Sequence, residues 1–299
     1  MNSRNIGFMQ GRLSRMADGK IQSFPWDCWR EEFAVAEKIG LHLMEWTLDQ
    51  SKLHENPLLT VTGQRDIKQL CQRHEIAISS LTGDCFMQAP FWKATNKELC
   101  ISLKNSFMAI ANACQEIGIT YVVVPLVDNG RIENQEQEDQ LIQFLDDKAH
   151  LFASKGLKVI FESDFTPVEL ARFISFLDSS IFGINYDIGN SAALGFIPQE
   201  EFAAYGNRIM NVHVKDRMLG GTTVPLGTGN AKFDVVFKEL RKINYAGNLI
   251  LQTARAMDDD HASPLIRYRD MTIDWMTKHG LAPDKAGKYH HARVLTKTP

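Results

Sequence analysis

The chain has 299 residues, with 33 Lys and Arg against 36 Asp and Glu and a formal net charge of −3. This near-balance argues against duplex nucleic acid or an anionic membrane as the main partner, because both select strongly basic surfaces. The hydrophobic fraction of 44% is typical of a globular protein, and the length suits either one α/β barrel or two smaller domains.

Cysteine usage and apolar runs bear on the cellular compartment. The five cysteines are odd in number and show neither C-x-x-C nor zinc-knuckle spacing. We therefore expect reduced thiols and a cytoplasmic protein. Residues 1–12 contain no apolar run of signal-peptide length, and no stretch approaches the roughly 18 apolar residues of a membrane span, so we expect neither feature.

Short apolar runs alternate with longer amphipathic stretches along the chain. In chain order, strands are predicted at residues 6–9, 41–46, 76–81, 121–124, 158–161, 183–186, 209–214 and 249–251. Each is followed by a predicted helix, at residues 25–38, 62–74, 96–117, 135–155, 167–177, 198–205, 234–243 and 261–278. This alternation predicts a single (β/α)8 TIM barrel over residues 1–279, with a polar tail at 280–299. The alternative is a doubly wound open sheet, but no G-x-G-x-x-G follows the first strand.

Active sites of this fold lie where the strands end, and polar residues gather at the predicted ends. The residues expected to contact substrate are Arg12, Glu45, Trp46, Asp84, Asn190, Arg217 and Arg255. The arginines suit a phosphate or carboxylate, and Trp46 offers an apolar face to a sugar. Residues 225–229, PLGTG, follow the seventh strand, where many barrels bind phosphate through backbone N–H groups. Alternatively, the basic residues pair with rim carboxylates.

Three further residues stand at the ends of consecutive predicted strands. They are Glu162, Asp187 and His213, each after a run of residues expected to be buried. Two carboxylates and an imidazole suit a divalent ion such as Mn²⁺, Mg²⁺, Co²⁺ or Zn²⁺. The alternative interpretation is that they form salt bridges and helix caps at the barrel rim.

Several segments carry a family resemblance. They are FMQGRLS at 8–14, KVIFESD at 158–164, INYDIGNSAALG at 184–195, NVHVKDR at 211–217 and PLGTGNAKFDVVFKELRKINYAGNLILQTAR at 225–255. The chain resembles the xylose isomerase-like TIM barrel superfamily, in its sugar and sugar-phosphate isomerase and epimerase branch. The resemblance implies a metal held by Glu162, Asp187, His213 and a fourth residue, a Glu in the relatives, at Gln252. It also implies that this fourth Glu and Glu162 serve as the two acid/base groups.

Gln252 departs from the family pattern. Its amide oxygen can still reach a hard cation, but the side chain cannot accept a proton near neutral pH. We therefore expect Glu162 to act as the base of a metal-stabilised enediolate mechanism, with Lys215 stabilising the oxyanion and Glu45 or Asp84 as a substitute second base. Aldose–ketose isomerisation needs one base, whereas epimerisation needs a proton donor on the other face.

Three functions are carried forward. The first is a sugar or sugar-phosphate isomerase or epimerase, acting on a small molecule as a monomer or homo-oligomer. The second is a sugar-binding barrel with weak or no metal and no isomerase chemistry, because Gln252 replaces the Glu. The third is an endonuclease IV-like DNA repair enzyme, against which the net charge and the single His at a strand end argue.

Overall fold

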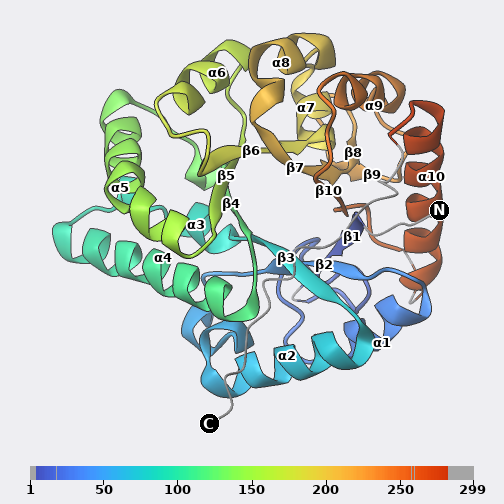
Figure 1. The fold of residues 1–299 in the computed structure, drawn as a ribbon, viewed down its shortest axis with the longest axis horizontal. Helices are drawn as coiled ribbons and strands as arrows, with labels where there is room; N and C mark the ends of the chain where they lie inside the picture. Colours follow the sequence, from blue (N-terminus) through green and yellow to red (C-terminus); the bar gives the residue numbers. More distant parts are fainter. Residues whose placement is uncertain (1–4, 18, 257, 259, 282–299) are drawn as a thin grey trace.

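The computed structural model describes residues 5–17, 19–256, 258 and 260–281. Eight parallel strands close into a barrel in the order β1-β10-β7-β6-β5-β4-β3-β2, which confirms the predicted (β/α)8 fold (Figure 1). The barrel strands are β1 (Ile6–Met9), β2 (Leu43–Thr47), β3 (Ala77–Thr82), β4 (Tyr121–Leu126), β5 (Lys158–Ser163), β6 (Phe182–Asp187), β7 (Ile209–Val214) and β10 (Asn248–Leu251). Most of the predicted tail, from residue 282 on, lies outside the described residues.

An outer ring of helices surrounds the barrel. It comprises α1 (Glu31–Lys38), α2 (Val61–His74), α4 (Lys97–Ile117), α5 (Gln135–Ser154), α6 (Pro167–Ser175), α8 (Pro198–Tyr205), α9 (Phe233–Lys242) and α10 (Ala262–Lys278). Local signals fix several ends: the Asn96 side chain accepts a hydrogen bond from the Leu99 backbone at the start of α4, and Gly118 ends that helix with a left-handed φ of 89°. These signals explain why most predicted helices fall within a few residues of the observed ones.

The first helix is shorter than predicted. It begins at Glu31 rather than at residue 25, because the preceding segment forms turns that pack aromatic rings against the barrel. Phe24 lies 5.4 Å from Trp46 between ring centroids, and Trp29 lies 5.6 Å from the same ring. The aromatic residues before α1, whose spacing looks helical in the sequence, therefore lie in an irregular segment. Phe24, Trp29 and Trp46 pack together between β2 and α1 as an aromatic wedge.

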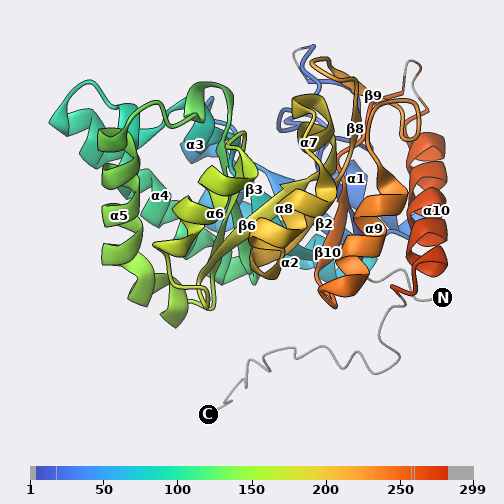
Figure 2. The ribbon, with the colours of Figure 1, turned by 90° about the horizontal axis from the view of Figure 1, so that it is seen from above.

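Further elements lie in the loops that follow the strands. They are two short helices, α3 (Asp84–Gln88) and α7 (Ile188–Leu194), a hairpin of β8 (Asp216–Arg217) and β9 (Thr223–Val224), and the 3₁₀ turns η1 (Leu53–Glu55), η2 (Pro57–Leu59), η3 (Phe91–Lys93), η4 (Asp128–Gly130) and η5 (Gly206–Arg208). Figure 2 shows α7, β8 and β9 on one side of the barrel, at the carboxyl ends of the strands. These loops build the rim of the candidate site.

The barrel has an apolar outside and a partly polar inside. Outward-facing residues pack against the helices, as Phe161 of β5 does against Phe173 of α6 at 5.2 Å between centroids. Inside, near the carboxyl ends of the strands, lie Glu45, Asn185, Asn211 and His213, none more than 2% exposed. Because buried polar groups are costly unless they are hydrogen-bonded, this layer points to a function rather than to stability alone.

Two features concern the whole chain. The five cysteines are all free thiols, two of them, Cys100 and Cys114, on the same helix α4. Among the described residues, no helix combines the length and the apolar character needed to cross a bilayer.

Candidate functional site

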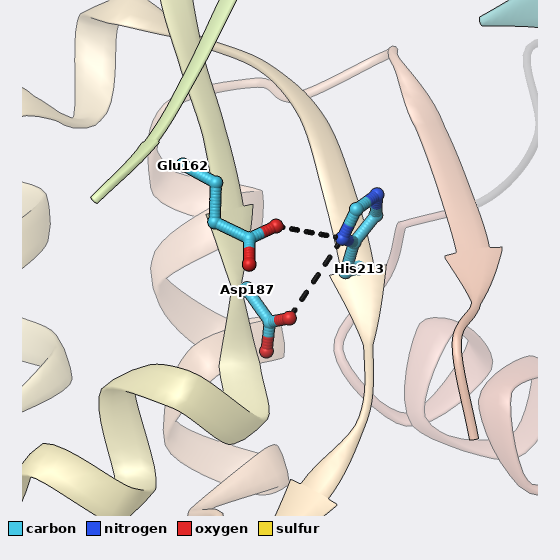
Figure 3. Close-up of side chains that lie close together, drawn as sticks. All are labelled: Glu162, Asp187 and His213. Carbon is cyan, nitrogen blue, oxygen red and sulfur yellow. Dashed lines mark ion pairs between the residues drawn. The ribbon is translucent and has the colours of Figure 1, made fainter. Parts of the chain in front are cut away.

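Three of the predicted residues meet at the carboxyl ends of adjacent strands. Glu162 lies on β5, Asp187 ends β6 and His213 lies on β7, and one ligand atom from each lies within 4.8 Å of the others (Figure 3). His213 Nδ1 is 3.0 Å from Glu162 Oε2 and 3.7 Å from Asp187 Oδ2. All three side chains are buried, so their charges interact strongly.

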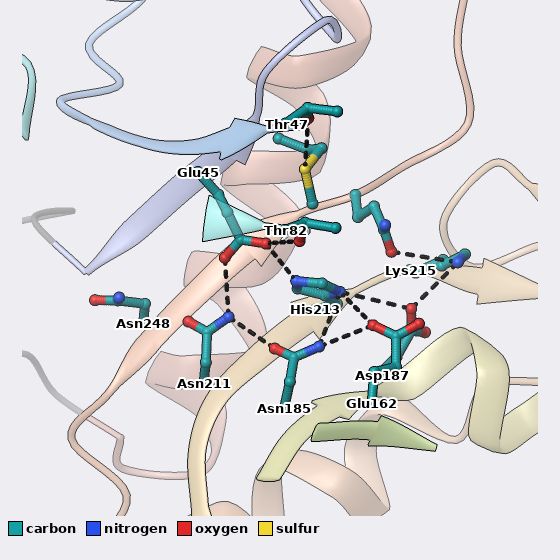
Figure 4. A network of polar contacts seen from close by, with 12 residues as sticks. Glu45, Thr47, Thr82, Glu162, Asn185, Asp187, Asn211, His213, Lys215 and Asn248 are labelled. Carbon is teal, nitrogen blue, oxygen red and sulfur yellow. Dashed lines mark hydrogen bonds and ion pairs between the residues drawn. The ribbon is translucent and has the colours of Figure 1, made fainter. Parts of the chain in front are cut away.

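Glu45 lies on the other side of the His213 ring. Its Oε1 is 2.7 Å from His213 Nε2, and its two oxygens also accept hydrogen bonds from Thr82 Oγ1 and from Asn211 Nδ2 (Figure 4). The carboxylate fixes a proton on Nε2, which leaves Nδ1 to face Glu162 and Asp187. Glu45 has no exposed surface and holds the imidazole from the interior of the barrel. The structure does not support the expected contact of Glu45 with substrate.

Burial and charge act in opposite directions on the imidazole. Burial lowers the pKa of His213, but the Glu45 carboxylate and the hydrogen bonds with Asp187, Glu162 and Glu45 outweigh it and raise that pKa well above its ordinary value. Glu45 also lies fully buried, yet the charge of His213 holds the pKa of its carboxyl below the usual value. The carboxylates around the ring therefore favour its protonated form.

Two asparagines link the Glu45 carboxylate, inside the barrel, to the Glu162 carboxylate nearer the mouth. Neither asparagine was predicted from the sequence. Asn211 Nδ2 donates to Asn185 Oδ1 at 2.7 Å, and Asn185 Nδ2 donates to Glu162 Oε2 at 2.9 Å. Each precedes a candidate ligand by two residues, in Asn185-x-Asp187 and Asn211-x-His213. Because side chains two apart on a strand share a face, this N-x-D and N-x-H spacing is the signal that predicts them.

Lys215 and Gln252 complete the upper part of the site. Lys215 Nζ donates to Asp187 Oδ2, to Asn190 Oδ1 and to Gln252 Oε1, each at 3.2 Å. Asn190 in turn donates to Glu162 Oε1 at 2.6 Å. A Cβ at Gly189 would lie 2.6 Å from Lys215 Cγ, so glycine is what lets the lysine stem reach the site. The lysine ammonium therefore lies beside the residue that departs from the family pattern.

The side chains present fit a divalent ion. One imidazole nitrogen, two carboxylates and an amide oxygen form a mixed N/O donor set, and the first three converge within 4.8 Å. The clustered carboxylates need positive charge, which a protonated His213 and Lys215 supply in this structure. An ion that bound here would release the proton of Nδ1, since a ligating imidazole must be neutral.

The arginines expected at the substrate are bound largely to backbone carbonyls. Arg12 is 4% exposed and donates to the carbonyls of Ile21 and Thr253 at 2.8 and 2.9 Å. Arg255 donates to the Ile21 and Ser14 carbonyls, both at 2.9 Å. Burial, followed by the charge of Arg255, lowers the pKa of Arg12 to about 9. Both guanidiniums thus hold the loop between β1 and α1, which corrects their expected place in a phosphate pocket.

Arg217 and the PLGTG loop differ from expectation in the same way. Arg217 donates to the Gly221 carbonyl and to Asn190 Oδ1. The loop wraps around the buried carboxylate of Asp216, which accepts the backbone N–H groups of Gly227, Gly229 and Ala231 at 2.9 to 3.0 Å. These N–H groups already bind an anion of the chain itself, so this structure does not offer them to a phosphate.

The two remaining predicted contacts separate. Trp46 is fully buried in the aromatic wedge, where its Nε1 donates to Asn56 Oδ1, so the expected sugar contact is not supported. Asp84 lies at the mouth and is 8% exposed. Gln22, in the loop after β1, donates to Asp84 Oδ2 at 2.8 Å and accepts from Gln252 Nε2 at 2.7 Å. Gln22 therefore bridges Asp84 to Gln252 over the candidate site, a contact that no sequence motif predicts.

Comparison with known proteins agrees with the fold. The family model described as xylose isomerase-like TIM barrel matches residues 33–277. Inosose dehydratase of Clostridium botulinum (strain Alaska E43 / Type E3) is 24% identical over 67% of this chain and 76% of its own length. L-ribulose-5-phosphate 3-epimerase of Escherichia coli (strain SMS-3-5 / SECEC) is 23% identical over 85% of this chain and 92% of its own.

Solved structures show the same fold. D-allulose 3-epimerase from Methylomonas sp. superposes with a TM-score of 0.67 at 16% identity, over 92% of this chain and 97% of its own. The IOLI protein, determined with a bound zinc atom, superposes with a TM-score of 0.69 at 17% identity, over 92% of this chain and 99% of its own. At these identities the likeness concerns the fold alone.

Proposed function

Because the chain belongs to the xylose isomerase-like TIM barrel family, we propose that it is a metal-dependent isomerase or epimerase of a sugar or sugar phosphate. The observation that carries the proposal is the convergence of Glu162, Asp187 and His213, with Glu45 orienting the imidazole. The curated relatives include L-ribulose-5-phosphate 3-epimerases and inosose dehydratases. Removal of a proton from a carbon beside a carbonyl is the step common to such reactions.

In the proposed reaction, Glu162 takes the proton from the carbon next to the substrate carbonyl, and an enediolate forms. Asn190 holds Glu162 Oε1, which aims the carboxylate, and Lys215 donates to the oxygen that gains negative charge. A divalent ion held by Glu162, Asp187, His213 and Gln252 would polarise the carbonyl as a Lewis acid. The buried site limits water, which strengthens these interactions.

A second candidate is a sugar-binding barrel without isomerase chemistry. The observation that favours it is the position of Lys215, whose ammonium lies 3.2 Å from both Asp187 Oδ2 and Gln252 Oε1 and supplies positive charge beside two of the four expected ligands. The endonuclease alternative needs several metals. Within the described ranges, a single group of three His, Cys, Asp or Glu side chains brings its ligand atoms within 4.8 Å of one another, so the structure does not favour that alternative.

The test combines metal titration with isotope exchange. The purified protein is titrated with Mn²⁺, Co²⁺ and Zn²⁺, then incubated in deuterated water with a panel of ketoses, aldoses and their phosphates. Metal-dependent deuterium incorporation beside a carbonyl supports the isomerase or epimerase. Saturable sugar binding without exchange, at any metal concentration, supports the binding barrel instead.

A further inference from the structure

Proton transfer in the proposed site lacks one of its two groups. Epimerisation moves a proton off one face of a carbon and onto the other, so two side chains must exchange protons with the substrate. Glu162 can serve as one of them. The residue after β10 is Gln252, whose amide neither accepts nor donates a proton in this pH range. Epimerisation in this site therefore requires a second carboxyl group at the mouth of the barrel.

Asp84 meets this requirement by position. It lies after β3, at the first residue of α3, and its side chain is 8% exposed. Glu162 and Lys215 lie near enough at the same mouth for their charges to act on it. Its single hydrogen bond to a described residue comes from Gln22 Nε2, and Gln22 is bound in turn by Gln252. The carboxyl group is therefore joined to Gln252 through one side chain, that of Gln22.

The hydrogen bonding of Asp84 differs from that of the structural carboxylates. Asp216 accepts three backbone N–H groups, and Asp49 accepts bonds from Phe24 N, from the Ser23 hydroxyl and from the Gln88 amide. These groups are saturated by the fold. From the described residues Asp84 accepts one bond, donated by a side chain of a surface loop to Oδ2, and its other oxygen accepts none.

The charges around Asp84 favour a group that carries a proton near neutral pH. Burial and the negative charges of Asp49 and Glu162 raise the pKa of Asp84 to about 7, against the opposing effects of the Gln22 hydrogen bond and of Lys215. Arg12 and the adjacent Cys85 thiol also interact with Asp84 electrostatically. A pKa near the working pH is the condition under which one group both donates and accepts protons efficiently.

We propose that Asp84 is the second acid/base residue of the site, exchanging a proton with the substrate carbon from the β3 side of the mouth while Glu162 does so from the β5 side. This inference rests on the proposed function. Glu162 takes the proton, and the electron pair moves onto the carbonyl oxygen. The pair then returns as Asp84 gives its proton to the same carbon. One carboxyl group ends protonated and the other ionised, so protons balance and no oxidant is needed.

The first experiment compares Asp84→Asn with the wild type. The change keeps the shape and removes the proton-transferring group, so epimerisation and exchange from the Asp84 side should fall by about 10²- to 10⁴-fold. The midpoint for Mn²⁺ binding should change far less than the activity, because among the described residues Asp84 forms no hydrogen bond or ion pair with a candidate ligand. Asp84→Glu should recover part of the activity. Retained activity in Asp84→Asn, or parallel loss of metal binding, overturns the proposal.

The second experiment uses the pH profile of kcat/KM. The active form carries one proton, on either Asp84 or Glu162, and loses it as the pH rises. The activity of the wild type should therefore fall as the pH rises through about 7, equally for both epimers. Asp49→Asn removes a nearby negative charge and should move this limb to lower pH. A limb that does not move refutes the assignment, even where Asp84→Asn fails to fold. A wild type silent on every sugar refutes instead the proposed function itself.

Discussion

Replacement of Glu45 by Gln tests whether the buried carboxylate orients the metal-binding imidazole. The Glu45–His213 contact is 2.7 Å long, and neither side chain is exposed. Leaving one charge of a buried pair without its partner costs about 3–5 kcal/mol, and the Gln oxygen retains part of the bond to Nε2, so we expect a loss of about 3 kcal/mol in the free energy of unfolding. Outer carboxylates on ligating histidines contribute about 10–100-fold to metal affinity, or about 1.4–2.7 kcal/mol, so the metal dissociation constant should rise by that factor.

The assay is competition with a chromogenic chelator for Zn²⁺ or Mn²⁺, alongside urea unfolding. Glu201→Gln is the matched control: Glu201 is 1% exposed on α8 and accepts bonds from Tyr186, Ser191 and Tyr205, none of which is a candidate ligand. It should lower stability while leaving metal affinity unchanged. If Glu45→Gln is folded and binds metal as tightly as the wild type, the orienting role is refuted.

Three further predictions concern the ligands and the loop after β7. Gln252→Glu should raise affinity for Mn²⁺ at least about tenfold and increase deuterium wash-in on a ketose panel, since a charged oxygen joins the donor set; no gain in either measurement, with the fold intact, would reject a lost acid/base role at this position. His213→Ala should weaken metal binding far more than His261→Ala, and superimposable titration curves would contradict the assignment. Asp216→Ala should lower the free energy of unfolding by about 3 kcal/mol in urea, because three backbone N–H groups lose their charged acceptor; a change within about 0.5 kcal/mol, as is usual at surface sites, would contradict this.

Much of the barrel could be predicted because buried strands and amphipathic helices leave different periodicities. The placement of Glu162, Asp187 and His213 could be predicted for a related reason, because each lies at or near the end of a predicted buried strand. The short helices α3 and α7 could not, since five and seven residues are too few to show a helical repeat. They form where tertiary contacts hold them.

The errors at β2 have one cause. Glu45 and Trp46 are neighbours in the sequence, and both were expected at the substrate, but side chains on a strand alternate between faces. Glu45 therefore points into the barrel beneath His213, while Trp46 packs outward against the aromatic wedge. The roles of Arg12 and Arg255 could not be predicted from the sequence, because both donate to a backbone carbonyl of a loop. Every residue has a backbone carbonyl, so no residue type indicates such a partner.

The contacts of Glu45 have a consequence for the order in which the protein folds. They join residues 166 and 168 positions apart, from β2 to β7, while the pairing of β1 with β10 closes the barrel. During synthesis, Glu45 therefore leaves the ribosome long before His213 exists, and it must stay hydrated until the last strands arrive. The four-residue polar layer can form only at closure, when the loop entropy of nearly the whole chain has been lost. The contact that orients the imidazole is thus a property of the closed barrel, whereas the adjacent strands that carry Glu162, Asp187 and His213 can pair before closure.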